Sequence, residues 1–200
     1  MCIRDRGVLD EGGHATFLTQ SQMGKKESIE DTAKVLGRMF DGIEFRGFKQ
    51  ENVEALAKYS GVPVWNGLTD VDHPTQTLAD FLTIQEHLDK PLNEIKFVFT
   101  GDIRNNVCYG LMYGACKVGM HFVCLGPKSL EMDPEVVAYC QEECKKSGGS
   151  LTITDDTDAV DGADVIYTDI WVSMGEDESL YKPSCLLYTS DAADDRISVD

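Results

Sequence analysis

The chain has 200 residues, 42% of them hydrophobic and 26% charged, so it is long enough for one large domain or two small ones with cores. Its net charge of −17 argues against a nucleic-acid partner, because binding a phosphate backbone needs clustered Lys and Arg. No apolar run is long enough to cross a bilayer, so we expect no membrane partner and infer small-molecule ligands.

The two ends of the chain do not fit the pattern between them. Residues 1–6, MCIRDR, and residues 185–200, CLLYTSDAADDRISVD, match neither a signal peptide nor the periodicity of a helix or strand. Both resemble conceptual translations of a sequencing adapter, so we expect them to be non-native. The natural part is then expected to be residues 7–184, an internal piece of a longer protein.

Helices and short apolar strands alternate between these ends. A helix tail closed by Gly12 and Gly13 is followed by predicted strands at residues 14–19, 43–45 and 62–66 and by helices at residues 28–41, 51–60 and from 74 onward. After Lys90-Pro91 the alternation restarts, with strands expected at residues 95–101, 121–126, 150–154 and 164–169 and helices at residues 106–118, 134–146 and 158–160. Apolar strands alternating with helices predict an α/β fold of two doubly wound parallel-sheet domains, at residues 7–90 and 91–184.

Five cysteines lie between the ends, at positions 108, 116, 124, 140 and 144. Their odd number and the lack of CxxC pairs predict free thiols in a reducing cytoplasm. Cys140 and Cys144 share one face of a predicted helix, and His121 is not far away in sequence, so a metal site is an alternative. Thiol pairs without a second ligand pair are more often buried small side chains, and we expect no metal.

Unusual polar residues follow four of the predicted strands. In open parallel sheets, ligands bind outside the carboxyl ends of the strands. Arg46, the segment DHPTQTLADF at residues 72–81, the group Asp102, Asn105 and Asn106, and the group Asp169, Ser173 and Met174 each follow such an end. We therefore expect these four clusters to meet in one site.

The helix that begins at Pro74 is open to two interpretations. Proline in the first helical position costs no backbone bond. At about 100° per residue, His73, Gln76 and Asp80 share one side, roughly opposite Leu78, Phe81 and Leu82, and are not expected in the core. Either His73 or Asp72 caps the helix and Gln76 is solvated, or the positive helix N-terminus aims these side chains at an oxyanion.

The loops after the second group of strands also leave alternatives open. GDIRNN at residues 101–106 could bind a dinucleotide, but it lacks the GxGxxG spacing, and no acidic residue ends the next strand. Its two asparagines could be helix caps or could bind an amino acid. Trp171 and Met174 could pack internally or border a site, as exposed apolar loop residues often do.

Four stretches together resemble the ornithine carbamoyltransferases, members of a wider aspartate and ornithine carbamoyltransferase superfamily. They are SQMGKKESIEDTAKVLGRMFDGIEFRG (21–47), VPVWNGLTDVDHPTQTLADFLTIQEHL (62–88), GDIRNN (101–106) and DIWVSMG (169–175). HPTQ is typical of the superfamily, whereas DIWVSMG points to ornithine. The resemblance covers essentially all of residues 7–184, and it implies a carbamoyl phosphate domain at 7–90 and an ornithine domain at 91–184.

The resemblance also implies roles for single residues. Carbamoyl phosphate would be held by Gln22, Arg46, His73, Pro74, Thr75 and Gln76, of which Arg46, His73 and Gln76 would be catalytic. L-Ornithine would be held by Asn106, Asp169, Ser173 and Met174. No metal and no organic cofactor are implied, and the family's members are homotrimers or larger homo-oligomers with shared sites.

Several expectations limit this interpretation. The family's Ser-Thr-Arg-Thr phosphate loop, its His-Cys-Leu-Pro motif and a late arginine would lie outside residues 7–184, so we expect the 200-residue chain to be inactive. Two rivals stay open. One is a carbamoyltransferase for another amine, such as putrescine or a modified ornithine, and the other is a non-catalytic nucleotide-binding α/β module.

Overall fold

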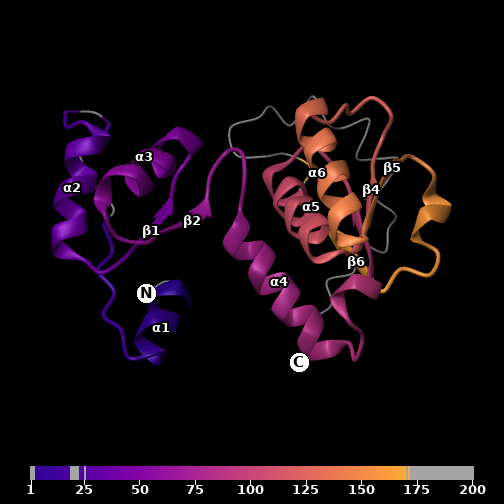
Figure 1. The fold of residues 1–200 in the computed structure, drawn as a ribbon, viewed down its shortest axis with the longest axis horizontal. Helices are drawn as coiled ribbons and strands as arrows, with labels where there is room; N and C mark the ends of the chain where they lie inside the picture. The colour runs from indigo at the N-terminus through magenta and orange to yellow at the C-terminus, as the bar shows by residue number, and fades with distance from the viewer. Residues whose placement is uncertain (1–2, 19–22, 25, 170, 172–200) are drawn as a thin grey trace. The chain divides into compact units, whose positions relative to one another are not determined.

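The structure is a computed structural model in which residues 3–18, 23–24, 26–169 and 171 are described. The chain divides into two compact units: residues 1–43 with 54–64, and residues 44–53 with 65–200. Figure 1 traces the elements along the chain. Among the described residues, no helix is long and apolar enough to cross a membrane.

The first unit contains α1 (Ile3–Asp10), α2 (Ile29–Met39) and most of α3 (Gln50–Ser60). The hydroxyl of Ser28 accepts a hydrogen bond from the Asp31 N–H at 3.0 Å, which caps α2. Gly37 permits close packing of α2 on the end of α3, since a Cβ there would lie 1.8 Å from the Ser60 carbonyl oxygen.

Two predictions for this region are wrong. Residues 14–18 form no strand, and Phe17 and Leu18 are exposed rather than packed, so no burial stabilises an extended conformation there. Helix α1 begins at Ile3, inside the segment MCIRDR that was expected to lie outside any element. An ion pair one turn apart, between Arg6 and Asp10 at 3.5 Å, accompanies this helix.

Strands β1 (Ile43–Arg46) and β2 (Val64–Leu68) form a two-stranded sheet. The N–H of Gly47 donates to the Leu68 carbonyl at 3.0 Å at its carboxyl end. Strand β2 begins two residues later than predicted, because the Ser60 hydroxyl bonds both polar backbone groups of Val62, and Gly61 has a positive φ of 76°. These residues form a turn instead of a strand.

The second sheet has four parallel strands in the order β5-β4-β3-β6. They are β3 (Lys96–Thr100), β4 (His121–Leu125), β5 (Ser150–Thr154) and β6 (Val165–Thr168). The connecting elements are α4 (Pro74–His87), η1 (Leu92–Glu94), α5 (Asn106–Val118), α6 (Pro134–Ser147) and η2 (Thr157–Val160). In Figure 1, α5 and α6 lie side by side, in agreement with their extensive packing contacts. The predicted α/β fold with parallel sheets is confirmed.

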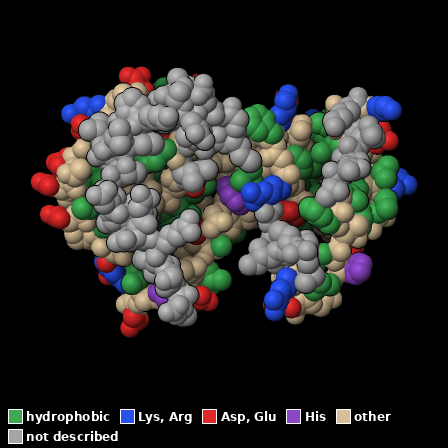
Figure 2. All heavy atoms as spheres, turned by 180° about the vertical axis from the view of Figure 1, so that it is seen from behind, with side chains coloured by type: hydrophobic (Ala, Val, Ile, Leu, Met, Phe, Trp, Pro, Cys, Tyr) green, Lys and Arg blue, Asp and Glu red, His purple; other side chains and the backbone are tan. Residues whose placement is uncertain are grey.

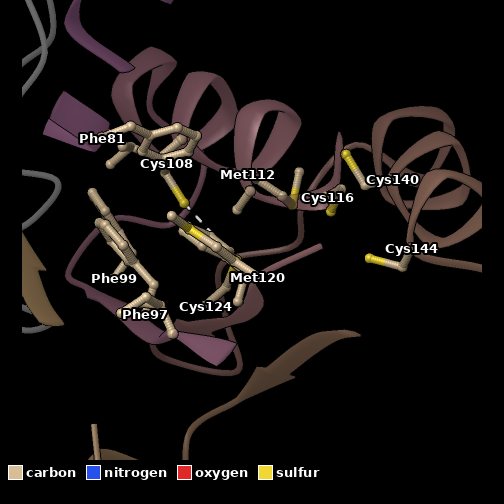
Figure 3. Packing of buried hydrophobic residues seen from close by; sticks show 14 of the residues in the cluster. Phe81, Phe97, Phe99, Cys108, Met112, Cys116, Met120, Cys124, Cys140 and Cys144 are labelled. Carbon is tan, nitrogen blue, oxygen red and sulfur yellow. Dashed lines mark hydrogen bonds between the residues drawn. The ribbon is translucent and has the colours of Figure 1, made fainter. Parts of the chain in front are cut away.

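Both faces of the four-stranded sheet carry buried side chains. On one face, Phe97, Phe99 and Phe122 pack in a cluster with α4, α5 and α6 that includes all five cysteines between the chain's ends (Figure 3). On the other face, Val98, Val123 and Leu125 form a smaller cluster with residues 159, 160 and 163. The near-continuous apolar run of β3 follows from this burial on both sides.

Candidate functional site

The strand order reverses beside β3, because the chain passes from β3 to β4 and β5 on one side and returns to β6 on the other. Loops that leave such neighbouring strand ends open a crevice in which ligands bind. Gly101, with φ of 132°, begins the loop after β3, and Asp169 follows β6. The Asn105 side-chain amide reaches the Asp169 carboxylate at 3.5 Å and so joins the two loops.

The two adjacent asparagines have different structural partners. Asn105 is buried and caps α5, accepting a hydrogen bond from the Cys108 N–H at 2.7 Å. Asn106, the first residue of α5, donates from its side-chain amide to the Thr69 main-chain carbonyl at 2.6 Å. The capping interpretation therefore holds for Asn105, whereas Asn106 links α5 to the turn that precedes His73.

An ion pair with a buried carboxylate occupies the loop between β3 and α5. The carboxylate of Asp102 accepts hydrogen bonds from the Arg104 guanidinium at 3.0 and 2.8 Å and from the Arg104 N–H at 2.9 Å. Only 6% of the Asp102 side chain is exposed, against 37% for Arg104. This bidentate pair fixes the loop in which Asn105 and Asn106 lie.

The N-terminus of α4 presents the His73 segment. His73 occupies the N-cap position but makes no side-chain capping bond, and the Asp72 carboxylate accepts a hydrogen bond from the His73 N–H at 2.7 Å. The Thr75 hydroxyl lies 3.4 Å from His73 Nδ1 and donates to the Asn66 carbonyl at 3.3 Å. The His73 side chain therefore does not cap α4.

Two glycines of α5 allow this helix end to approach closely. A Cβ on Gly110 would lie 2.7 Å from Asp72 Oδ1, and one on Gly114 would lie 2.6 Å from the Thr77 methyl group. Burial against α5 raises the pKa of the Asp72 carboxyl, although the hydrogen bond from His73 opposes this shift. The two glycines therefore determine how closely the start of α4, with Asp72 and His73, packs against α5.

Gln76 does not point freely into solvent. Its side-chain amide donates to Asp80 Oδ1 at 2.9 Å, and burial raises the pKa of Asp80. Burial and the nearby negative charges of Asp80 and Asp169 raise the pKa of Tyr167 to about 12. Asp80 therefore links Gln76 electrostatically to Tyr167 of β6.

The prediction that Leu78, Phe81 and Leu82 form the apolar face of α4 is wrong in part. Phe81 is buried, as are Thr77 and Ile84, but Leu78 and Leu82 are 69% and 56% exposed. The buried stripe is displaced because α4 packs on the glycine positions of α5, which lie opposite Thr77 and Phe81. Asp80 consequently borders the buried stripe and is partly buried.

Arg46 is the exposed last residue of β1. The bond from Gly47 to Leu68 joins its strand end to the chain that leads to His73. Of the other predicted ligands, Pro74 and Thr75 lie in the first turn of α4, while Gln22, Ser173 and Met174 lie outside the described residues.

Thr69 and Gln50 join these segments, and the sequence analysis did not single them out. Thr69 is fully buried, and its hydroxyl donates to Gln50 Oε1 at 2.7 Å. The amide N–H groups of Val71 and Asp72 donate to the same hydroxyl at 3.3 and 3.2 Å. A Thr-Asp pair before a turn is the only sequence signal for this role, and it is weak.

A cavity of about 550 Å³ lies on the side of α4 that faces α5 and α6. It is lined by Asp72, Pro74, Thr77, Leu78, Gly110, Tyr113, Gly114, Lys117 and Tyr139.

On the face drawn in Figure 2, the described Lys and Arg side chains are scattered among acidic and hydrophobic ones. Among the described residues, that face shows no broad basic patch.

The alternative of a metal at Cys140, Cys144 and His121 finds no support. Within the described part of the chain, no group of three or more His, Cys, Asp or Glu side chains could hold a metal ion. His121 is exposed and lies 2.9 Å from the Ser150 hydroxyl, while both cysteines are buried in the core beside Cys116 (Figure 3).

Comparison with known proteins gives matches over both halves of the chain. A model of the "Aspartate/ornithine carbamoyltransferase, carbamoyl-P binding domain" matches residues 5–86, and one of the "Asp/Orn binding domain" of the same family matches residues 93–185. A catabolic ornithine carbamoyltransferase of Clostridium perfringens is 68% identical over 189 residues, which cover 94% of this chain. One of Streptococcus agalactiae is 58% identical over 186 residues, or 90% of this chain.

Solved structures agree with these matches. The ornithine carbamoyltransferase of Pyrococcus furiosus superposes with a TM-score of 0.83 at 39% identity, covering 90% of this chain and 58% of that one. The anabolic enzyme of Campylobacter jejuni gives a TM-score of 0.86 at 31% identity, covering 95% and 64%. The chain spans 57% and 55% of the lengths of the clostridial and streptococcal relatives. It belongs to the aspartate/ornithine carbamoyltransferase family.

Proposed function

We propose that the protein, at the full length of its relatives, transfers the carbamoyl group of carbamoyl phosphate to the side-chain amine of L-ornithine, giving L-citrulline and phosphate. The observation that carries the proposal is the bond from Asn106 to Thr69, which joins the His73 turn to the start of α5. Residues 7–90 would bind carbamoyl phosphate and residues 91–184 ornithine, which the two domain matches support. The names of the relatives support ornithine as the acceptor.

The chemistry follows from the residue types. The uncharged amine of ornithine attacks the carbamoyl carbon, a C–N bond forms, the bond to the phosphate oxygen breaks and the amine loses a proton. Negative charge grows on the carbamoyl oxygen, toward which Arg46 and His73 would donate while Gln76 holds the carbamoyl amide. Each preorganised donor of this kind lowers the barrier by about 3 to 4 kcal/mol.

On the ornithine side, Asp169 would accept from the α-ammonium group and Asn106 would donate to the carboxylate. The second amide hydrogen of Asn106 remains for this contact when the first is bonded to Thr69. Ser173 and Met174 would complete this side, and Gln22, Pro74 and Thr75 the carbamoyl phosphate side. A cytoplasmic homotrimer or larger homo-oligomer is part of the same proposal, and light scattering of the purified protein tests the assembly.

The decisive experiment uses a full-length chimera, in which the segments outside the match are taken from the C. perfringens relative. We expect it to produce citrulline, and we expect His73→Ala to lower turnover at least about tenfold while the circular dichroism spectrum is retained. His87→Ala is the matched control, since His87 lies on the same helix, is exposed and bonds the Thr83 carbonyl. Wild-type turnover in His73→Ala would remove His73 from the mechanism.

Two further measurements separate the rival functions. Ornithine should compete in binding where putrescine does not, because a diamine has no carboxylate for Asn106. Carbamoyl phosphate should raise the unfolding temperature where NAD and ATP do not. Stabilisation by a nucleotide instead would favour the non-catalytic module.

A further inference from the structure

Thr69 lies at the junction of the segments that carry the proposed substrate ligands. All three of its polar groups are bonded within the protein: the N–H donates to the Asp72 carbonyl at 2.9 Å, the hydroxyl bonds Gln50, and the carbonyl accepts from Asn106. A fully buried hydroxyl with this many partners holds its neighbours in one geometry.

The hydroxyl of Thr69 closes the turn before His73. It accepts from the N–H groups of Val71 and Asp72, and the Asp72 carboxylate in turn holds the His73 N–H. The turn is thus fixed from Thr69 to the first residue before α4. Its geometry also decides where the Thr69 carbonyl points, and this carbonyl is the partner of Asn106.

Gln50 ties the same hydroxyl to the segment that follows Arg46. Its Oε1 accepts from Thr69 at 2.7 Å and from the Asn66 amide at 3.4 Å, and its N–H donates to Asp70 Oδ1 at 3.1 Å. The chain of bonds from Gln50 through Thr69 to Asn106 therefore connects residues 19 and 37 positions apart in sequence.

We propose that Thr69 is a positioning residue for the ornithine carboxylate: its buried hydroxyl, bonded to Gln50, holds the turn whose carbonyl orients the Asn106 amide. Thr69 touches neither substrate in this scheme and acts through Asn106. The inference rests on the proposed function, because it assigns the group that Asn106 would serve.

The first test uses the 200-residue chain and no substrate. In nitrogen-15 NMR spectra, Thr69→Val should shift the side-chain amide signals of Asn106, because the carbonyl that accepts from them moves. Thr69→Ser, which keeps the hydroxyl, should leave them nearly in place. The matched control is Thr83→Val, which removes a hydroxyl bonded to the Ala79 carbonyl on the exposed side of α4. Unchanged Asn106 signals in Thr69→Val would overturn the inference.

The second test measures kinetics in the full-length chimera. Thr69→Val should raise KM for ornithine about tenfold, the size expected for weakening a hydrogen bond to a charged group, and Thr69→Ser should restore it. A merely structural residue would lower the active fraction, and so kcat, without changing KM. In an Asn106→Ala background, Thr69→Val should add little, since both changes remove the same contact.

Three results would separate the role of Thr69 from the proposed function. Unchanged KM in Thr69→Val, or effects that add fully in the double variant, would overturn the role of Thr69 and leave the proposed function intact. A wild-type chimera that binds no ornithine would overturn both. If Thr69→Val does not fold, Gln50→Met removes the acceptor of the same hydroxyl, and the same KM change is expected from it.

Discussion

Replacing Gly110 with alanine tests how closely α5 must approach the His73 turn. The new methyl group would lie 2.7 Å from Asp72 Oδ1 and 3.1 Å from Thr77 Oγ1, and the His73 backbone nitrogen is 3.5 Å away. Alanine in a helix interior gains about 1 kcal/mol over glycine, whereas overpacking costs about 1 to 3 kcal/mol. We therefore expect the free energy of unfolding to fall by about 1 kcal/mol.

Urea unfolding followed by tryptophan fluorescence measures this change. Both tryptophans, Trp65 and Trp171, belong to the compact unit that contains Gly110, so the signal reports on that unit. At a slope of about 1 to 3 kcal/mol per molar urea, the midpoint should fall by roughly 0.3 to 1 M. In the full-length chimera, carbamoyl phosphate should also stabilise the variant less than the wild type.

Ala79→Gly provides the matched control, because Ala79 is an exposed residue inside α4 of the same unit. It should lose about 1 kcal/mol through helix propensity alone and leave ligand stabilisation unchanged. If Gly110→Ala instead raises the midpoint by as much as Ala79→Gly lowers it, the added methyl group meets no resistance. The reasoning about close approach would then be refuted.

Three other outcomes are expected. A hydrogen bond from Lys90 lowers the pKa of Asp164, so Asp164→Asn should lower the unfolding temperature at neutral pH. This loss should shrink only as the pH falls through the lowered pKa, where the wild-type carboxylate itself becomes protonated. A pH-independent loss would contradict this. Burial raises the pKa of Asp72, so its ionised carboxylate destabilises the folded protein as the pH rises. Asp72→Asn should therefore raise the unfolding temperature more at neutral pH than below about pH 4. An equal gain at the two pH values would refute this prediction. Burial, together with the neighbouring Cys124 thiol, raises the pKa of Cys108. A thiol reagent should therefore label Cys108 only when the protein unfolds, and mass spectrometry detects the label. Labelling of Cys108 in the folded protein at the rate of the unfolded chain would contradict its burial.

Much of the second sheet and its helices could be predicted from the sequence. Helix α5 has the predicted bounds because an Asn cap and Gly119 in the left-handed region mark its ends, and both are local signals. Strand β3 was predictable because its three central residues are apolar and buried on both faces. Residues 14–18 include three apolar side chains, but a strand also needs neighbouring strands, which a local pattern does not reveal.

The site was predictable only where strand ends mark it. Asn106 and Asp169 stand out because they follow β3 and β6, which pair with each other, so both residues lie at the carboxyl edge of the same sheet. The partner of Asn106 could not be predicted, since a main-chain carbonyl of residue 69 carries no side-chain signal. The exposure of Leu78 could not be predicted either, because it depends on two glycines of α5 that displace the packing stripe of α4.

The strand order β5-β4-β3-β6 has a consequence for synthesis on the ribosome. Strand β3 can pair with β4 soon after both emerge from the ribosome. Its other edge stays unpaired until β6 is synthesised, and the first residue of β6 comes 65 positions after Thr100. At about 5 to 20 residues per second, that edge stays open for roughly 3 to 13 s. Its sequence, KFVFT, has three consecutive apolar, β-favouring residues, the kind that pair with other chains when exposed. Nascent chains stalled before residue 165 should therefore depend most on chaperones.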